Sequence, residues 1–92
     1  MEWELRVYRI RDGSLGDFVS EWREHVLPLR RAAGFEVIGP WTGVGGEFVW
    51  LIGHDDLERA DAAYYESPGR RAVEPDPARH IVGVQTWRLE PA

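Results

Sequence analysis

Hydrophobic positions recur with two different periods along the chain, and each change of period marks the end of an element. Residues 2–11 follow a two-residue period, which predicts a strand. Asp12 and Gly13 then form a turn, and Ser14 is a good N-cap. Apolar residues recur at helical spacing from there on, which predicts a helix over residues 15–33.

Gly34 is the residue expected just past the end of this helix, and the pattern then returns to strands. The second half of the chain ends in a short helical turn and a last strand, with prolines between them. The predicted order is a strand over 35–42, a glycine-rich hairpin over 43–46, a strand over 47–54, a helix from Asp55 with Leu57, Ala60 and Tyr64 on its inner stripe, a helical turn from Ser67, an extended connector at Pro75 and Pro77, and a strand over 80–89.

The resulting order, β-α-β-β-α-β, predicts an α+β fold of the ferredoxin-like type, in which one four-stranded antiparallel sheet carries both helices on one face. We expect residues 1–92 to form a single domain. The strand over 47–54 is apolar on both faces, although the helices can cover only one of them. We therefore expect a homodimer in which a second copy packs against the uncovered face of the sheet.

Three segments carry a resemblance to a known family, the NIPSNAP domain. They are the helix end WREHVLPLRRAAGF, the Gly-Pro-Trp strand at residues 39–41 and the segment YYESPGRRA. The resemblance extends from Leu5 to Leu89 and implies a dimeric α/β-barrel made of two ferredoxin-like sheets packed face to face. The same superfamily is similar to antibiotic-biosynthesis monooxygenases, haem-degrading enzymes and small-molecule isomerases, many of which place a ligand cleft between sheet and helices.

Composition narrows the possible partners. The net charge of −5 argues against nucleic acid as the main partner, because phosphate binding needs a basic surface. No run of about 18 apolar residues is present, so we expect no membrane span. Cysteine is absent, which excludes disulfides and thiolate catalysis. Nothing before the first strand reads as a targeting segment, and we expect a cytoplasmic location. The doublets Arg30–Arg31 and Arg70–Arg71 are expected to lie on solvated helix faces.

His25 is the candidate catalytic residue. At regular helical spacing it lies in line with Phe18, Trp22 and Leu29, which predicts that it faces the sheet. A histidine there could act as a general base or hold a ligand, or it could be a core-edge residue bonded to a backbone carbonyl or a buried acid. Pro28 removes a helical hydrogen bond to the carbonyl of Glu24 and is expected to bend the helix.

Aromatic residues supply further ligand-binding candidates. Trp22 on the first helix and Trp41 and Trp50 on the strands could line a pocket for a planar ligand, or they could fill the core. Tyr64 lies on the inner stripe of the second helix, where a buried hydroxyl needs a partner from the substrate or from the protein. Packing at the edge of the core is the alternative.

Arg6 and Tyr8 project from one face of the first strand. If that face is buried, Arg6 must be paired, and Glu4 is the available neighbour. Two interpretations remain open: an ion pair at the dimer interface, or an arginine that binds a carboxylate in a cleft.

We expect no metal site and no cofactor. His54 ends the third strand and His80 starts the fourth, which would place them roughly 20–25 Å apart. Three functions remain: a NIPSNAP-like protein that binds a small hydrophobic or aromatic molecule between helices and sheet; a cofactor-independent monooxygenase-like enzyme for an aromatic or polyketide-like substrate, with His25 as base; or a non-catalytic dimeric interaction module.

Overall fold

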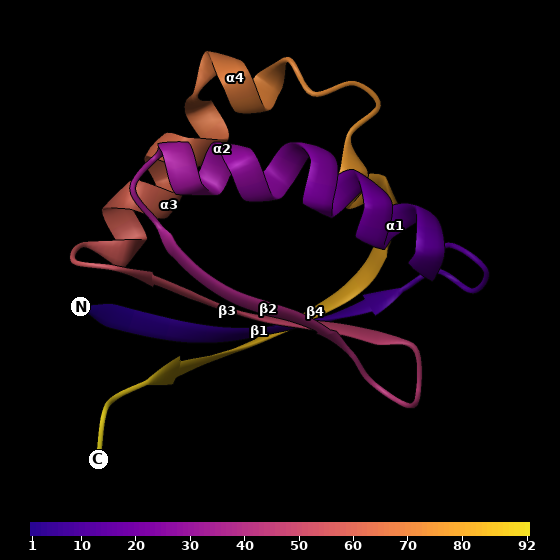
Figure 1. The fold of residues 1–92 in the computed structure, drawn as a ribbon, viewed down its shortest axis with the longest axis horizontal. Coiled ribbons are helices and arrows are strands. Elements are labelled where there is room, and N and C mark those ends of the chain that lie inside the picture. Colours follow the sequence, from indigo (N-terminus) through magenta and orange to yellow (C-terminus); the bar gives the residue numbers. More distant parts are fainter.

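A computed structural model describes all residues, 1–92, as an antiparallel sheet with its helices on one face (Figure 1). The strand order in the sheet is β2-β3-β1-β4, with β1 antiparallel to both β3 and β4. This is the ferredoxin-like arrangement that the sequence predicted. The strands are β1 (Glu2–Ile10), β2 (Glu36–Thr42), β3 (Glu47–His54) and β4 (Ile81–Leu89).

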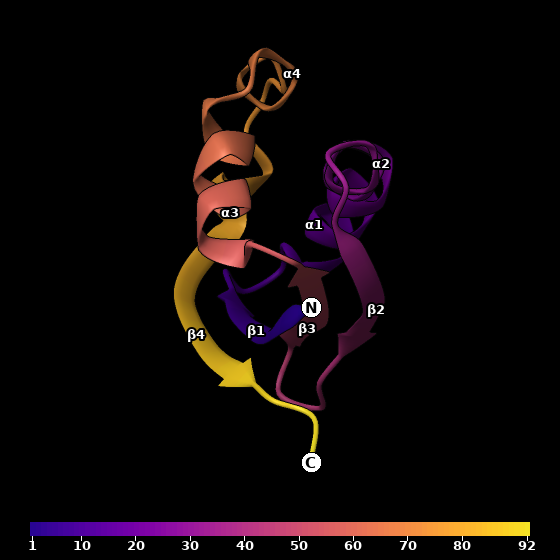
Figure 2. The same ribbon diagram turned by 90° about the vertical axis from the view of Figure 1, so that its left-hand side faces the viewer.

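The first helical segment has three parts, α1 (Leu15–Glu21), the π-helix η1 (Trp22–Val26) and α2 (Leu27–Ala32). The second comprises α3 (Leu57–Glu66), the short α4 (Pro68–Arg71) and the 3₁₀-helix η2 (Pro77–His80). Seen along the sheet, α3 and α1–α2 stand side by side above the strands, and α4 lies farther out beyond α3 (Figure 2). None of these helices is both long and apolar enough to cross a membrane.

The connector before β4 differs from the prediction. Pro77 does not extend the chain but begins η2, and His80 ends that helix instead of opening the strand. The Asp76 carboxylate accepts a hydrogen bond from the backbone N–H of Ala78 at 2.9 Å, which caps the 3₁₀ turn. A proline is favoured at this first position because its missing N–H has no helical partner there.

The core lies between the helices and the inner face of the sheet. Its centre is aromatic: the rings of Trp22 and Trp50 lie 5.3 Å apart between centroids, and those of Phe18 and Phe48 lie 4.8 Å apart, both edge to face. All four residues are at most 1% exposed. Burial of these rings supplies the main driving force for folding in so short a chain.

The opposite side of the sheet, which we call the outer face, carries no helix. In the strand register, Leu5 pairs with Leu51 and Trp87, and Leu51 pairs with Ile38, so these side chains share that side. Several of its large apolar residues are openly exposed, including Trp41 at 51% and Trp87 at 48%. The apolar residues of the outer face are Trp3, Leu5, Val7, Ile38, Trp41, Val49, Leu51, Trp87 and Leu89.

Candidate functional site

A cleft of about 470 Å³ opens on the helix side of the sheet, between α3 and β4. Strand β4 is mostly exposed, so the inner face of the sheet is left uncovered along this edge. Alternate residues of β1 form the floor, because a two-residue period turns them toward the same side. The lining residues are Glu4, Arg6, Tyr8, Asp61, Tyr65, Ala78, Ile81, Val84 and Thr86.

A cluster of charged side chains forms the inner wall of this cleft. Asp61 of α3 bridges two arginines, with Oδ1 2.7 Å from Nη1 of Arg30 and Oδ2 3.2 Å from Nη2 of Arg6. Glu4 completes the cluster, since its Oε1 lies 2.8 Å from Nε of Arg6. At the rim, Arg88 Nε lies 3.7 Å from the other oxygen of Glu4, and Arg88 Nη1 lies 3.6 Å from Glu2. The guanidinium groups and carboxylates are thus equal in number, which offsets the cost of removing the buried ones from water.

Arg30 is held on its other sides by aromatic rings. Its guanidinium carbon lies 3.7 Å from the ring centroid of Tyr64 and 4.8 Å from that of Phe35, which is cation–π geometry. Its Nη2 donates a hydrogen bond to the Tyr65 hydroxyl at 3.2 Å. The residue is only 1% exposed, so it is a fixed part of the core and not a mobile surface charge.

Burial determines the protonation state of two tyrosines, Tyr8 in the cleft and Tyr64 in the core behind it. It raises the pKa of the Tyr8 and Tyr64 hydroxyls above the ordinary value, so both are neutral and can donate a hydrogen bond at neutral pH. Burial works against the charge of Arg6, but Tyr8, Asp61 and Glu4 outweigh it and raise the Arg6 pKa. The cleft therefore offers hydroxyl donors and paired charges, and the tyrosines are poorly suited to act as bases.

The sequence candidates fall into three groups. Arg6 and Tyr8 line the cleft, and the Arg6–Glu4 pair predicted for a buried face is present. That face lies toward the helices, on the side opposite the outer face, and the ion pair of Arg6 is made within one copy of the chain. A role of this pair in a dimer interface stays a prediction. Trp22, Trp50 and Tyr64 are 1%, 0% and 3% exposed and lie deeper, in the core behind the cleft.

The predicted orientation of His25 is wrong. Its side chain is 44% exposed, it lines none of the larger hollows, and its nearest charged partner is the exposed Glu24 at 4.0 Å. The hypothesis of an aromatic pocket is also wrong for Trp41. This residue lies on the outer face opposite Val49, away from Trp22 and Trp50.

The π-helix explains why regular spacing misplaced His25. The backbone N–H of Leu27 bonds to the carbonyl of Trp22, five residues back, and Pro28 has no N–H to bond to Glu24. The wider turn shifts the inward face by one residue. The buried positions along the segment are therefore Phe18, Trp22, Val26 and Arg30, at intervals of four.

The same shift turns Arg30 inward, whereas the sequence predicted it on a solvated face. Arg70 is also buried, at 8% exposed, and its Nη2 lies 2.8 Å from the Asp76 carboxylate, while Arg31 and Arg71 are exposed as predicted. Asp61 and Tyr65 were not among the predicted site residues. Their positions four residues apart on α3 were a usable signal, because that spacing puts two polar side chains on one helix face.

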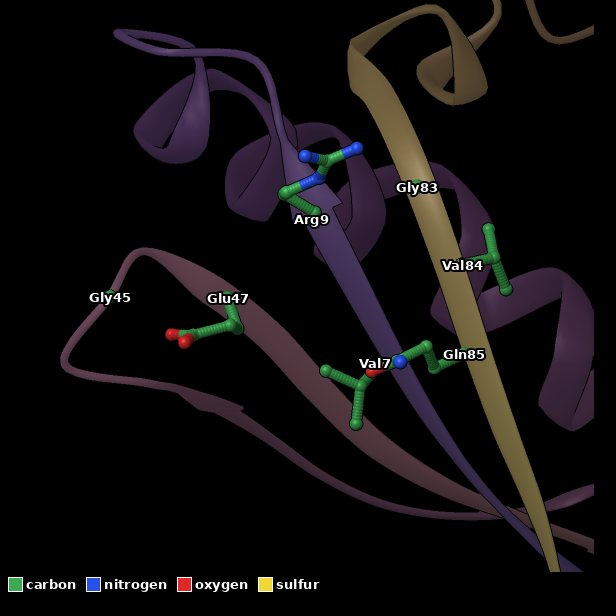
Figure 3. A pocket seen from close by; sticks show the side chains of 7 residues that line it. All are labelled: Val7, Arg9, Gly45, Glu47, Gly83, Val84 and Gln85. Carbon is green, nitrogen blue, oxygen red and sulfur yellow. The ribbon is translucent and has the colours of Figure 1, made fainter.

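A second hollow, of about 430 Å³, lies on the outer side of the sheet near the β2–β3 hairpin (Figure 3). Its walls combine Val7 and Gln85 with the charged Arg9 and Glu47. Arg9 and Glu47 are opposite each other in the strand register, yet their charged ends point away from one another (Figure 3). We place the candidate site in the cleft, because charged, aromatic and hydroxyl groups converge there on buried partners.

No group of three histidine or acidic side chains is placed to hold a metal ion. His54, at the end of β3, and His80, at the end of η2, serve other contacts. His54 Nδ1 accepts a hydrogen bond from the backbone N–H of Asp56 at 2.9 Å, and His80 Nε2 lies 3.0 Å from the Glu21 carboxylate.

Glu21 gives a test of acid stability. Its hydrogen bonds from Arg79 hold the Glu21 pKa below the ordinary value, so its contribution is present above the unfolded-state pKa and is lost as the pH falls through the folded one. We expect Glu21→Gln to weaken the acid-induced loss of stability below about pH 5 by about 0.5–1 kcal/mol. Urea unfolding at several pH values measures this, and Glu24→Gln, on the same helical segment but exposed, should leave the wild-type pH profile unchanged.

Comparisons with known proteins agree with this architecture. The NIPSNAP family model matches residues 3–86. A crystal structure of an uncharacterized NIPSNAP domain protein from Burkholderia xenovorans superposes with a TM-score of 0.86 at 22% identity, covering 100% of this chain and 95% of the other. A NIPSNAP family protein from Agrobacterium tumefaciens gives 0.84 at 21% identity, with 99% and 92% covered.

The fold is also shared outside that family. An antibiotic biosynthesis monooxygenase superposes with a TM-score of 0.70 at 13% identity, covering 100% of this chain and 99% of the other. At this identity the likeness concerns the fold alone. None of the curated proteins matches the sequence.

Proposed function

The chain belongs to the NIPSNAP family, and from this premise we propose that it binds a small, largely apolar molecule in the cleft between α3 and β4. The observation that carries the proposal is the cleft itself. A volume of about 470 Å³ lies within the range of small-molecule sites. Apolar walls from Ile81 and Val84 stand beside a few polar groups that can fix the orientation of a ligand.

The charge balance of the cleft favours a ligand without net charge. Arg6 and Arg30 are already neutralised by Glu4 and Asp61. A charged ligand group would therefore add an uncompensated charge to a partly buried site, which costs free energy. A planar, hydroxylated molecule that lies against Tyr65 and donates a hydrogen bond to the partly exposed carboxylate of Asp61 fits better.

Blocking the cleft tests this proposal. Thr86 lines the cleft from β4, is exposed, and lies opposite Arg6 in the register. We expect Thr86→Trp to fill much of the space and to remove any mass that the wild-type protein retains in native mass spectrometry after gentle purification, with at least a tenfold loss of affinity for that ligand.

Ala63→Trp is the matched control, because Ala63 is an exposed position of α3 that does not line the cleft. It should retain the ligand as the wild type does. Equal retention by the wild type and Thr86→Trp would place the ligand elsewhere and overturn the proposal.

We also infer that two copies associate through the outer face. Nine apolar residues adjoin one another there without a covering element, and contiguous exposed apolar patches usually mark an interaction surface. Packing of sheet against sheet would bury this face and leave the cleft, on the opposite side of the sheet, accessible in each copy. A dimer with two independent ligand sites is the expected assembly.

The alternatives are less well supported. A cofactor-independent monooxygenase needs a base within reach of its substrate, and the proposed base, His25, lies outside the cleft. The carboxylate oxygens of Glu4 and Asp61 are already occupied by contacts with Arg6 and Arg30, so neither is a free partner for a substrate proton. A pure interaction module would be favoured by a clean dimer that retains no ligand. A cytoplasmic location stays a prediction from the sequence.

A further inference from the structure

A smaller cavity, which we call the chamber, lies behind the cleft in the aromatic core. Its volume of about 30 Å³ is enough for one or two non-hydrogen atoms. Tyr8, Tyr65 and Ile81 line both the chamber and the cleft, so the two spaces adjoin. The chamber is thus placed to receive the narrow end of a molecule whose body occupies the cleft.

Four side chains that line the chamber carry a buried polar atom that completes no hydrogen bond, although the Trp50 indole approaches the Tyr8 hydroxyl and Arg70 approaches the Tyr64 hydroxyl. The atoms are Nε1 of Trp22, Nε1 of Trp50, Nε of Arg30 and the hydroxyl oxygen of Tyr64. Each of these residues is at most 3% exposed. The first three atoms can only donate hydrogen bonds, and the tyrosine hydroxyl can donate as well.

This concentration of unpaired donors indicates a missing acceptor. Buried polar groups in folded proteins are nearly always hydrogen-bonded, because an unpaired donor forfeits its bonds to water without replacement. A single unpaired donor can be tolerated, but four unpaired donors on residues around one small cavity could be satisfied by one acceptor placed in it. One atom with several lone pairs, placed in the chamber, could accept from more than one of them.

Charge separates the chamber from the cleft and indicates what kind of atom fits. Arg30 and Arg70 line the chamber, and no carboxylate does. The carboxylates of Glu4 and Asp61 line the outer cleft instead. The inner end therefore favours an electron-rich atom and disfavours an ammonium group, whereas the outer part favours hydroxyl or N–H donors.

We propose that the chamber is the recognition site for a neutral, proton-free acceptor atom of the ligand, a carbonyl oxygen, with the indole N–H groups of Trp22 and Trp50 among its donors. This inference rests on the proposed function of the cleft and specifies the chemistry of its ligand. The preferred ligand is an aryl carbonyl compound that points its carbonyl oxygen inward and any hydroxyl groups outward.

Three matched probes test the inference on the whole protein: methyl naphthyl ketone, ethylnaphthalene and naphthylethylamine. They share a skeleton and place an acceptor, a methylene or an ammonium group at the same position. The readout is the ¹H–¹⁵N spectrum, in which the five tryptophans give separate indole signals. We expect the ketone to bind about tenfold more tightly than the hydrocarbon, and the amine least tightly.

The ketone should also move the indole signals of Trp22 and Trp50 downfield and leave that of Trp87, on the outer face, in place. Trp87→Phe and Trp50→Phe identify the signals, and only the second should reduce the preference for the ketone. Equal affinity of ketone and hydrocarbon, with backbone shifts at Val84 and Thr86 but none at the two indoles, would overturn this inference and leave the proposed function standing. Failure of all three probes to bind near β4 would count against both.

Discussion

Asp61→Asn should lower the free energy of unfolding by about 3 kcal/mol, a large share of what a domain of this size possesses. The change keeps the shape of the side chain and removes its charge. Arg30 is 1% exposed and has Asp61 as its only carboxylate partner, so its guanidinium would be left buried without a counter-charge, with the new amide oxygen and the Tyr65 hydroxyl as neutral acceptors. Arg6 keeps Glu4 and loses less.

Arg30→Met should cost much less, within about 1 kcal/mol, although it removes the more deeply buried partner. The side chain of Asp61 is 26% exposed and retains its contact with Arg6, so it keeps both water and a counter-charge. Methionine fills a similar volume among Phe35, Trp50 and Tyr64 and leaves no charge behind.

Urea unfolding of the two single variants and of the double variant measures how much more stability is lost with the acid than with the arginine. The double variant should be more stable than Asp61→Asn alone by at least about 1 kcal/mol, because the stranded guanidinium is gone. If Arg30→Met proves as damaging as Asp61→Asn, the cluster stabilises the fold through packing and cation–π contacts, and charge compensation is not the main effect.

The sequence predicts the side-chain directions of the sheet better than those of the first helix. Two-residue periodicity in 2–11 and 47–54 was enough to show which side chains of β1 and β3 share a face, because the period of a strand leaves no intermediate direction. Which of the two faces the helices cover did not follow from it. Helical periodicity tolerates a local change of pitch. Pro28 was visible in the sequence, but whether it would bend the helix or widen a turn depends on which side chains the core accepts.

The candidate site was only partly predictable for the same reason. Arg6 and Tyr8 lie on a strand, and their shared face followed from the alternation. Arg30 and Arg70 are long charged side chains, which are seldom fully buried, and their partners Asp61 and Asp76 come from other turns of the chain. Such a pairing depends on the relative positions of the helices, which the local sequence pattern does not determine.

Leu51→Arg should convert the proposed dimer to a monomer, with a loss of affinity between copies of at least a hundredfold. Leu51 lies at the centre of the outer face, flanked by Leu5 on β1 and Ile38 on β2, and its side chain points away from the core. In the separated chain the arginine can reach water, so the fold should survive. In the dimer the same charge would be enclosed between two apolar sheets without a partner.

Analytical ultracentrifugation over a range of protein concentrations gives the dissociation constant, and circular dichroism confirms that the variant is folded. Ala63→Arg, which adds the same charge at an exposed position on the helix side, should remain as dimeric as the wild type. Because the cleft and the outer face lie on opposite sides of the sheet, the Leu51→Arg monomer should still hold the cleft ligand. A monomeric variant that lost the ligand would mean that the second copy completes the site, and a wild type that is monomeric at every concentration would overturn the proposed assembly.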